Sequence, residues 1–271
     1  MKEKLTERDI EKLKKLRFYL LDMDGTTYLG NRVFPGTLKF LDLLRKQGKK
    51  FLFLTNNSSQ DAEFYAQKLQ KMGIDVSAQE VFTSGEATAR YITSLKRNPR
   101  VFPLGTPSFE RELEKAGCIL TDENPDFVVL GFDKTLTYEK VKKACLLLRE
   151  GIKYIASHPD INCPTEEGLI PDAGAIIALI KASTGREPDI IIGKPRKEFI
   201  YEALKKMDAK REESAIVGDR LYTDIRSGLE AGITSILVLT GETKLEDLSS
   251  SPYQPTFVLD SLEELAEIIS N

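Results

Sequence analysis

The sequence predicts an α/β fold in which parallel strands alternate with helices. Short apolar runs and amphipathic stretches follow one another along the 271 residues, and this is the pattern of parallel strands that helices connect. A hydrophobic content of 41% supplies enough apolar surface for a core. The middle of the chain keeps this style without repeating the sequence, which indicates a second, smaller α/β domain.

The first part of the chain begins with a predicted strand over Phe18–Asp22 and a turn-rich segment. Pro35 opens a helix that ends near Gly48. A second strand, FLFLT, ends at Thr55, and the side chains of the following NNSS suit the N-cap of a helix over DAEFYAQKLQKMG. A short strand, EVFTS, comes next.

The predicted second domain contains three strands, two helices between them and a further helical run. The strands are VFPLG, FVVLGF and YIASH, and the helical segments are SFERELEKAG, TYEKVKKACLLLREG and AGAIIALIKASTG. The segment DIIIGKP begins a return to the first domain, which continues with ESAIVGD, a helix through Asp224 and Gly228, ITSILVLTG, TFVLD and SLEELAEII. We therefore predict one domain from residues 1–85 and 188–271 and an inserted one from residues 86–187.

Composition narrows the classes of function. A formal net charge of -3 provides no global field for nucleic acid or an anionic membrane. The charged N-terminus lacks the apolar run of a signal peptide, and the three cysteines suit a reducing compartment, so a cytoplasmic protein is predicted. A single histidine disfavours a Ser-His-Asp or Cys-His triad. Oligomeric state cannot be read from the sequence, and a homo-oligomer is left open.

The strongest chemical signal is LLDMDGTT, in which Asp22 and Asp24 follow an apolar strand and enter a glycine turn. Strand tips of this kind carry the sites of open α/β sheets. Two acids one residue apart point to the same side of an extended chain and repel each other unless a cation or a proton lies between them. Mg²⁺ would meet that need, whereas the alternative is a solvated turn or a calcium-type loop.

Polar residues at two other strand ends supply what a phosphate ester needs. Thr55, with the backbone N–H groups of Asn56 and Asn57, offers neutral donors for phosphate oxygens. Lys194 adds a cation on a Gly-Lys-Pro turn that restricts its backbone. Taken alone, Thr55 is more typical of a helix cap and Lys194 of a surface lysine.

A second acidic pair lies in AIVGDRLYTDI, with Asp219 at a strand tip and Asp224 in the following helix. Either acid alone is as well explained by helix capping. The ordered combination of a nucleophile, a hydroxyl group, a lysine and an acidic pair on successive strand ends is far more specific than any one member.

These four motifs resemble those of the haloacid dehalogenase-like hydrolase superfamily, in its NagD-like and p-nitrophenyl-phosphatase branch. The motifs are DMDGTTYLG, FLFLTNNSS, IIIGKP and AIVGDRLYTDI. The resemblance spans almost the whole chain and implies a Rossmann-like parallel-sheet core with an inserted α/β cap of the branch's type IIA. Thr27 stands where a leucine is usual, and Arg220 where close relatives carry asparagine.

The resemblance also implies a magnesium-dependent phosphatase that hydrolyses small phosphate monoesters through an aspartyl-phosphate. Asp22 would be the nucleophile and Asp24 the general acid and base. Four residues would bind the phosphoryl group: Thr55, Asn56, Asn57 and Lys194. The metal would be held by Asp22, the backbone carbonyl of Asp24 and Asp219, with Asp224 supporting it directly or through water.

Two other classes stay open at this point: a phosphoryl-accepting signalling module and a non-catalytic phosphosugar-binding protein. The paired acids and the length of the chain count against the first, and retention of both Asp22 and Asp24 counts against the second. The physiological substrate is not predicted among sugar phosphates, nucleoside monophosphates, glycerol phosphates and pyridoxal phosphate.

Several residues of the predicted cap are candidates to face a substrate: His158, Asp160, Asn162, Asp172 and Gly174. For Asp172 we favour a helix cap, and for His158 a structural role.

Overall fold

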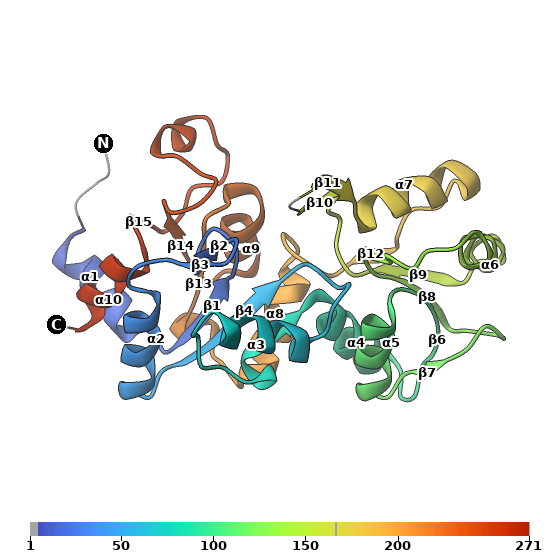
Figure 1. The fold of residues 1–271 in the computed structure, drawn as a ribbon, viewed down its shortest axis with the longest axis horizontal. Helices are drawn as coiled ribbons and strands as arrows, with labels where there is room; N and C mark the ends of the chain where they lie inside the picture. Colours follow the sequence, from blue (N-terminus) through green and yellow to red (C-terminus); the bar gives the residue numbers. More distant parts are fainter. Residues whose placement is uncertain (1–4, 166, 271) are drawn as a thin grey trace. The chain divides into compact units, whose positions relative to one another are not determined.

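The computed structural model describes residues 5–165 and 167–270, and the chain forms two compact units (Figure 1). The first unit takes its described residues from Met1–Leu54, Ala66–Val81 and Pro195–Asn271. The second takes them from Thr55–Tyr65 and Phe82–Lys194. Each unit is organised around its own sheet, as the predicted α/β class requires.

The large sheet has six strands in the order β15-β14-β13-β1-β4-β5. Their bounds are β1 Phe18–Asp22, β4 Lys50–Thr55, β5 Val81–Thr83, β13 Ser214–Gly218, β14 Thr234–Val238 and β15 Phe257–Leu259. Neighbouring strands from β15 to β4 run parallel. β13 and β14 are buried along their whole length, which agrees with the apolar runs AIV and ILV within them.

Helices cover this sheet in groups that pack on one another. Their bounds are α1 Glu7–Lys15, α2 Thr37–Lys46, α3 Ala62–Lys71, α8 Lys197–Met207, α9 Arg226–Ala231 and α10 Leu262–Ser270. Helix α10 packs against α1 and α2, whereas α8 packs against α9. In α2 the buried side chains Phe40, Leu41 and Leu44 recur with helical spacing.

Short elements complete the first unit. They are a hairpin of β2 Tyr28–Leu29 and β3 Arg32–Val33, 3₁₀ turns at Ala78–Glu80, Arg211–Glu213 and Leu245–Ser249, and a π-helical turn at Leu221–Ile225.

The second unit contains a five-stranded parallel sheet in the order β12-β9-β8-β6-β7. The strands are β6 Arg100–Leu104, β7 Ile119–Leu120, β8 Phe127–Leu130, β9 Lys153–Ala156 and β12 Ile190–Ile191. The helices are α4 Ser84–Leu95, α5 Pro107–Lys115, α6 Tyr138–Arg149 and α7 Ala173–Thr184. An antiparallel hairpin joins β10 Asn162–Thr165 to β11 Gly168–Pro171. Buried side chains from β6, β8 and β9 pack with α6 and α7 in one apolar cluster.

The structure differs from the sequence-based interpretation in five places. NNSS does not cap α3, because the Asp61 carboxylate accepts the N–H of Phe64 at 3.1 Å and fills that role. β12 pairs with β9, so the chain leaves the second sheet later than the predicted return at residue 188. Helices α1, α4 and α8 were not predicted.

Among residues 5–165 and 167–270, no helix is long and apolar enough to cross a bilayer.

Candidate active site

The carboxylates of Asp22 and Asp219 lie at the topological switch point of the large sheet. β1 is flanked by β13 on one side and β4 on the other, so the strand order reverses at β1. Asp22 is the last residue of β1, and Asp219 follows Gly218, the last residue of β13. Open α/β sheets bind ligands outside the carboxyl ends of strands at such a switch point.

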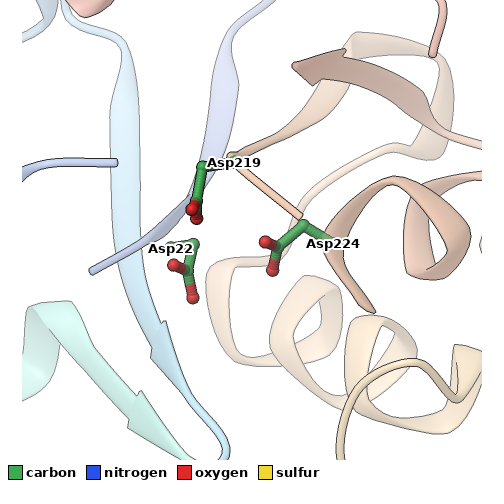
Figure 2. A group of neighbouring side chains, drawn as sticks. All are labelled: Asp22, Asp219 and Asp224. Carbon is green, nitrogen blue, oxygen red and sulfur yellow. The ribbon is translucent and has the colours of Figure 1, made fainter. Parts of the chain in front are cut away.

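Asp22, Asp219 and Asp224 form a cluster at this position (Figure 2). Each residue offers one carboxylate oxygen, and these oxygens all lie within 4.8 Å of one another. Asp219 and Asp224 are buried, with 1% and 0% of their surface exposed, and Asp22 is half-buried. The structure therefore brings together three of the predicted metal-site residues.

Hydrogen bonds fix the two buried carboxylates. Asp219 accepts the backbone N–H of Glu242 at 2.7 Å and the hydroxyl of Thr26 at 3.4 Å. Asp224 accepts the backbone N–H of Arg220 at 3.3 Å, within the turn that joins the two acids. Thr26 and Glu242 were not predicted, because each reaches the site from a loop whose course is set by tertiary structure.

Two glycines are required by the close approach of these acids. A Cβ on Gly25 would lie 2.4 Å from Oδ2 of Asp219, and its φ of +87° also favours glycine. A Cβ on Gly218 would lie 2.3 Å from the Cβ of Asp224. The glycines of DMDG and AIVGD therefore make room for the carboxylates, a physical reason for the motifs that the sequence alone did not reveal.

The charges of the cluster affect the groups around it. Burial would lower the pKa of Arg220, but the negative charges of Asp22, Asp219 and Glu242 outweigh this and raise it. Burial, together with the charges of Asp24 and Asp22, raises the pKa of the Tyr28 phenol. Arg220 therefore stays cationic and Tyr28 stays neutral beside the acidic residues.

The cluster fits a divalent cation. Carboxylates that approach one another this closely repel unless positive charge lies between or beside them. Carboxylate oxygens are the ligands that Mg²⁺ prefers, and Asp22, Asp219 and Asp224 provide one each. The donor set therefore agrees with the predicted magnesium site, with Asp224 inside the cluster rather than behind it.

Asp24 has a different setting. Its side chain is exposed, and it lies in the tight turn after β1, where its backbone forms an isolated bridge with Tyr28. It is not one of the three clustered carboxylates. An exposed acid two residues beyond Asp22 is free to reach a substrate or water, as a general acid or base must.

The predicted phosphate-binding residues are held together within the second unit. The side chain of Asn56 accepts the backbone N–H of Lys194 at 2.8 Å and donates to the Lys194 carbonyl at 2.9 Å. The N–H of Asn57 donates to the Thr55 hydroxyl at 3.1 Å. Lys194 is 5% exposed, so it is not the surface lysine of the alternative interpretation.

Among the predicted cap candidates, Asp172 caps α7 by accepting the N–H of Ala173 at 2.5 Å, as favoured from the sequence. The N–H of Gly174 donates to the Asp160 carbonyl at 2.7 Å. Asn162 is exposed at the start of β10. His158 is fully buried.

Comparison with known proteins matches two stretches of this chain to family models. Residues 19–119 match the model described as haloacid dehalogenase-like hydrolase, and residues 191–265 match a second model of HAD-like hydrolases. The two stretches contain the predicted catalytic, phosphate-binding and metal-site residues, whereas the cap candidates from His158 to Gly174 lie between them.

Relatives match nearly the full length. The chain is 37% identical over 252 residues to the 5'-nucleotidase YutF of Bacillus subtilis, covering 93% of this chain and 98% of that one. It is 39% identical over 258 residues to the acid sugar phosphatase of Staphylococcus aureus, covering 94% and 99%. A crystal structure of 4-nitrophenylphosphatase from Thermotoga maritima is 53% identical, with a TM-score of 0.91 and coverage of 95% and 99%. NagD from Escherichia coli is 35% identical, with a TM-score of 0.86 and coverage of 92% and 98%.

Proposed function

Because this phosphoric monoester hydrolase belongs to the haloacid dehalogenase-like hydrolases, in their NagD-like and p-nitrophenyl-phosphatase branch, we propose that it works through an aspartyl-phosphate on Asp22. The observation that carries the proposal is the cluster of Asp22, Asp219 and Asp224 at the switch point of the sheet. Of these three, only Asp22 is more than marginally exposed, which supports Asp22 as the residue that attacks a substrate.

Asp22, the backbone carbonyl of Asp24, Asp219 and Asp224 would hold Mg²⁺. A bound magnesium ion neutralises phosphoryl oxygens and the charge that redistributes over them in the transition state. The protein's own part is to keep the buried carboxylates fixed, through Glu242 and Thr26 on Asp219 and through Arg220 on Asp224.

In the first half of the reaction, an oxygen of Asp22 attacks phosphorus in line with the ester bond, which breaks and leaves an alkoxide. Asp24 protonates that leaving group. In the second half, Asp24 removes a proton from water, which attacks the phosphorus of the acyl phosphate and releases inorganic phosphate and the Asp22 carboxylate. One carboxyl group thus serves as acid and then as base.

We assign recognition of the phosphoryl group to Thr55, Asn56, Asn57 and Lys194. Backbone and hydroxyl donors with a lysine are the usual means of binding phosphate oxygens. The mutual hydrogen bonds of Asn56 and Lys194 support this assignment, because they fix the backbone from which the lysine side chain extends.

We propose small phosphate monoesters as substrates, with nucleoside monophosphates and sugar phosphates first, because the relatives are named for hydrolysis of such compounds. Glycerol phosphates and pyridoxal phosphate are further candidates, and a screen of metabolite phosphates should include them. We propose a cytoplasmic enzyme. A net charge of -3 favours one that uses neither nucleic acid nor an anionic membrane surface, and a homo-oligomer stays open.

The decisive experiment follows nitrophenol release from p-nitrophenyl phosphate in Mg²⁺. We expect turnover that EDTA abolishes and added Mg²⁺ restores. Asp22→Asn should be inactive, whereas Asp42→Asn, the same change at an exposed position of α2, should keep wild-type activity.

The intermediate is tested by quenching the reaction and reducing it with borohydride, which converts an aspartyl-phosphate to homoserine. Peptide mass spectrometry should find homoserine at position 22. Turnover without homoserine there would refute the Asp22 assignment.

A further inference from the structure

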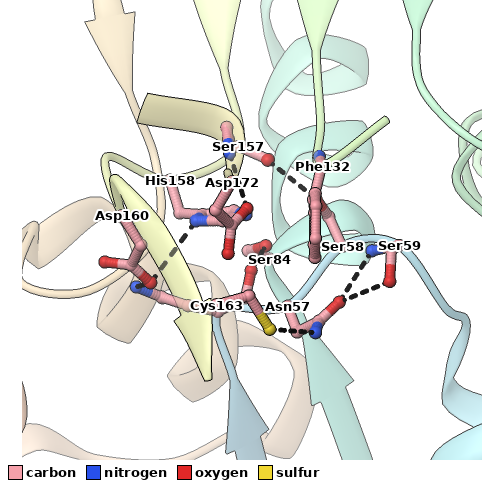
Figure 3. Close-up of polar contacts among 12 residues, drawn as sticks. Asn57, Ser58, Ser59, Ser84, Phe132, Ser157, His158, Asp160, Cys163 and Asp172 are labelled. Carbon is pink, nitrogen blue, oxygen red and sulfur yellow. Dashed lines mark hydrogen bonds and ion pairs between the residues drawn. The ribbon is translucent and has the colours of Figure 1, made fainter. Parts of the chain in front are cut away.

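The second unit buries the chain's single histidine between two acids (Figure 3). Nδ1 of His158 lies 3.4 Å from Oδ2 of Asp160, and Nε2 lies 3.4 Å from Oδ1 of Asp172. The histidine side chain has 0% exposure and that of Asp172 has 4%, whereas that of Asp160 is partly open at 35%. Neither ring nitrogen has a hydrogen-bond partner among the described residues, so each acid meets the ring through an ion-pair contact.

Between two ionised carboxylates, the ring makes favourable contacts on both sides only when each of its nitrogens carries a proton. A neutral imidazole carries one N–H and one lone pair, so one of its nitrogens would face a carboxylate with lone pair against lone pair. The imidazolium instead turns an N–H toward each acid and neutralises one of two negative charges, of which the one on Asp172 is buried.

The two acids respond differently to their surroundings. Burial would raise the pKa of Asp160, but His158, Asn56 and Lys194 together hold it below its usual range. Burial raises the pKa of Asp172, and the attraction of His158 only partly offsets this. Asp160 is therefore the more acidic of the two carboxyl groups.

Asp160 connects this bridge to the proposed phosphate site. The carboxylate oxygen that faces His158, Oδ2, also accepts the side-chain N–H of Asn56 at 3.0 Å. This contact fixes which end of the Asn56 carboxamide is nitrogen. The opposite end, Oδ1, accordingly accepts the backbone N–H of Lys194 at 2.8 Å.

The contacts from His158 through Asp160 and Asn56 therefore lead to the backbone of Lys194. If the charge or orientation of Asp160 changes, the Asn56 carboxamide loses the partner that sets its orientation, and both of its contacts to the Lys194 backbone loosen. Ser84 also donates its hydroxyl to the Asn56 carbonyl, which keeps the main chain of Asn56 in place while its side chain is perturbed.

We propose that His158 is a positioning residue, whose imidazolium bridges Asp172 and Asp160 and thereby orients Asn56 to clamp the backbone of Lys194. It touches neither substrate nor reacting atoms in this role. The inference rests on the proposed phosphate-binding role of Asn56 and Lys194. The titratable groups that face the bridge are the cation Lys134 and the neutral thiol of Cys163 near the acids, and the cation Lys194 near Asp160.

The first test uses nuclear magnetic resonance of the ¹⁵N-labelled, tag-free full chain. Because the chain has one histidine, all imidazole nitrogen signals belong to His158. We expect both to show the imidazolium signature at pH 7.5, and Asp172→Asn to shift the ring toward a neutral tautomer. A neutral tautomer in the wild-type protein at that pH would overturn the proposal, whether or not the protein is a phosphatase.

The second test compares steady-state kinetics of His158→Gln with the wild-type enzyme on p-nitrophenyl phosphate. Loss of one orienting hydrogen bond should raise KM, and the inhibition constant of inorganic phosphate, about tenfold, with kcat changed much less. Asp133→Asn is the matched control, because Asp133 is a buried acid of the same unit that pairs with Lys140 at 2.9 Å, outside the bridge.

Folding is checked by the thermal unfolding midpoint of each variant. If His158→Gln does not fold, Asp160→Asn carries the kinetic test, since it keeps the shape and removes the charge that Asn56 senses. A folded variant with unchanged KM and phosphate inhibition would overturn the proposal. Absence of wild-type turnover would instead refute the proposed function and leave the resonance result to stand on its own.

Discussion

Glu112 gives the second unit a stability that depends on pH. This glutamate of α5 is 6% exposed, and both of its oxygens lie within 2.8 Å of the Thr83 hydroxyl. Burial, with further contributions from the charges of Glu86 and Asp61, raises the pKa of Glu112 from 4.5 to about 8 and outweighs the opposing hydrogen bonds. The folded unit therefore holds a proton that the unfolded chain releases at neutral pH.

The sign of the effect follows from that difference. A carboxyl group with a raised pKa contributes its full stability below about pH 4.5, and this contribution is lost as the pH rises toward about 8. The two pKa values differ by about 3.5, and each unit is equivalent to about 1.4 kcal/mol, so the whole effect is on the order of 5 kcal/mol. About 3 to 4 kcal/mol of it should fall between pH 5 and pH 8.

The assay is urea unfolding at both pH values, with pulse hydrogen exchange on peptides from α5 to report the free energy of unfolding of this unit. Glu112→Gln keeps the shape of the protonated acid and should remove most of the difference. Glu114→Gln, an exposed glutamate on the same helix, should keep the wild-type dependence. Parallel pH curves for the wild-type protein and Glu112→Gln would refute the reasoning.

Three further predictions concern the acidic site. Asp24→Asn should lower kcat by about 10² to 10⁴ while calorimetry finds Mg²⁺ binding largely retained, and loss of the metal site in this variant would contradict a purely acid-base role for the side chain. Gly218→Ala places a methyl group against Asp224 and should raise the Mg²⁺ concentration for half-maximal activity about ten- to a hundredfold. Asp219→Asn should abolish Mg²⁺-dependent thermal stabilisation, and an unchanged midpoint shift would place the metal elsewhere.

The sequence predicts the large sheet well because each strand is an apolar run buried on both faces. The predicted strand Phe18–Asp22 is confirmed as β1, and Thr55 is confirmed as the end of β4. Helix α4 was missed because its buried face includes small and polar residues, among them Ser84, Gly85 and Thr88, that give no clear apolar period. Helix α8 was missed although its buried Phe199, Ala203 and Met207 recur with helical spacing. The return from the second unit was set too early, because the short strand β12 has no local feature that assigns it to either sheet.

The candidate site also has a part that the sequence predicts and a part that only the tertiary structure reveals. Asp22 and Asp219 follow strands of a parallel sheet, so their meeting at one edge is a consequence of topology that the sequence already contains. The bridge from His158 to Asn56 joins residues about a hundred positions apart through side-chain contacts. Periodicity and capping rules act over a few residues and carry no information on such contacts.

The two units should differ in how readily their residues change among members of the branch. The acids at the strand ends are fixed by the sheet and by the glycines that make room for them, so the proposed nucleophile and metal ligands belong to the first unit. The residues that orient Asn56 and Lys194 belong to the second unit. There His158 is buried between two acids, so substitution of one member of this ion bridge should destabilise the fold unless the other members change as well. Substitutions at exposed positions such as Asn162 avoid that cost, so we expect them to change substrate preference more readily than substitutions at His158.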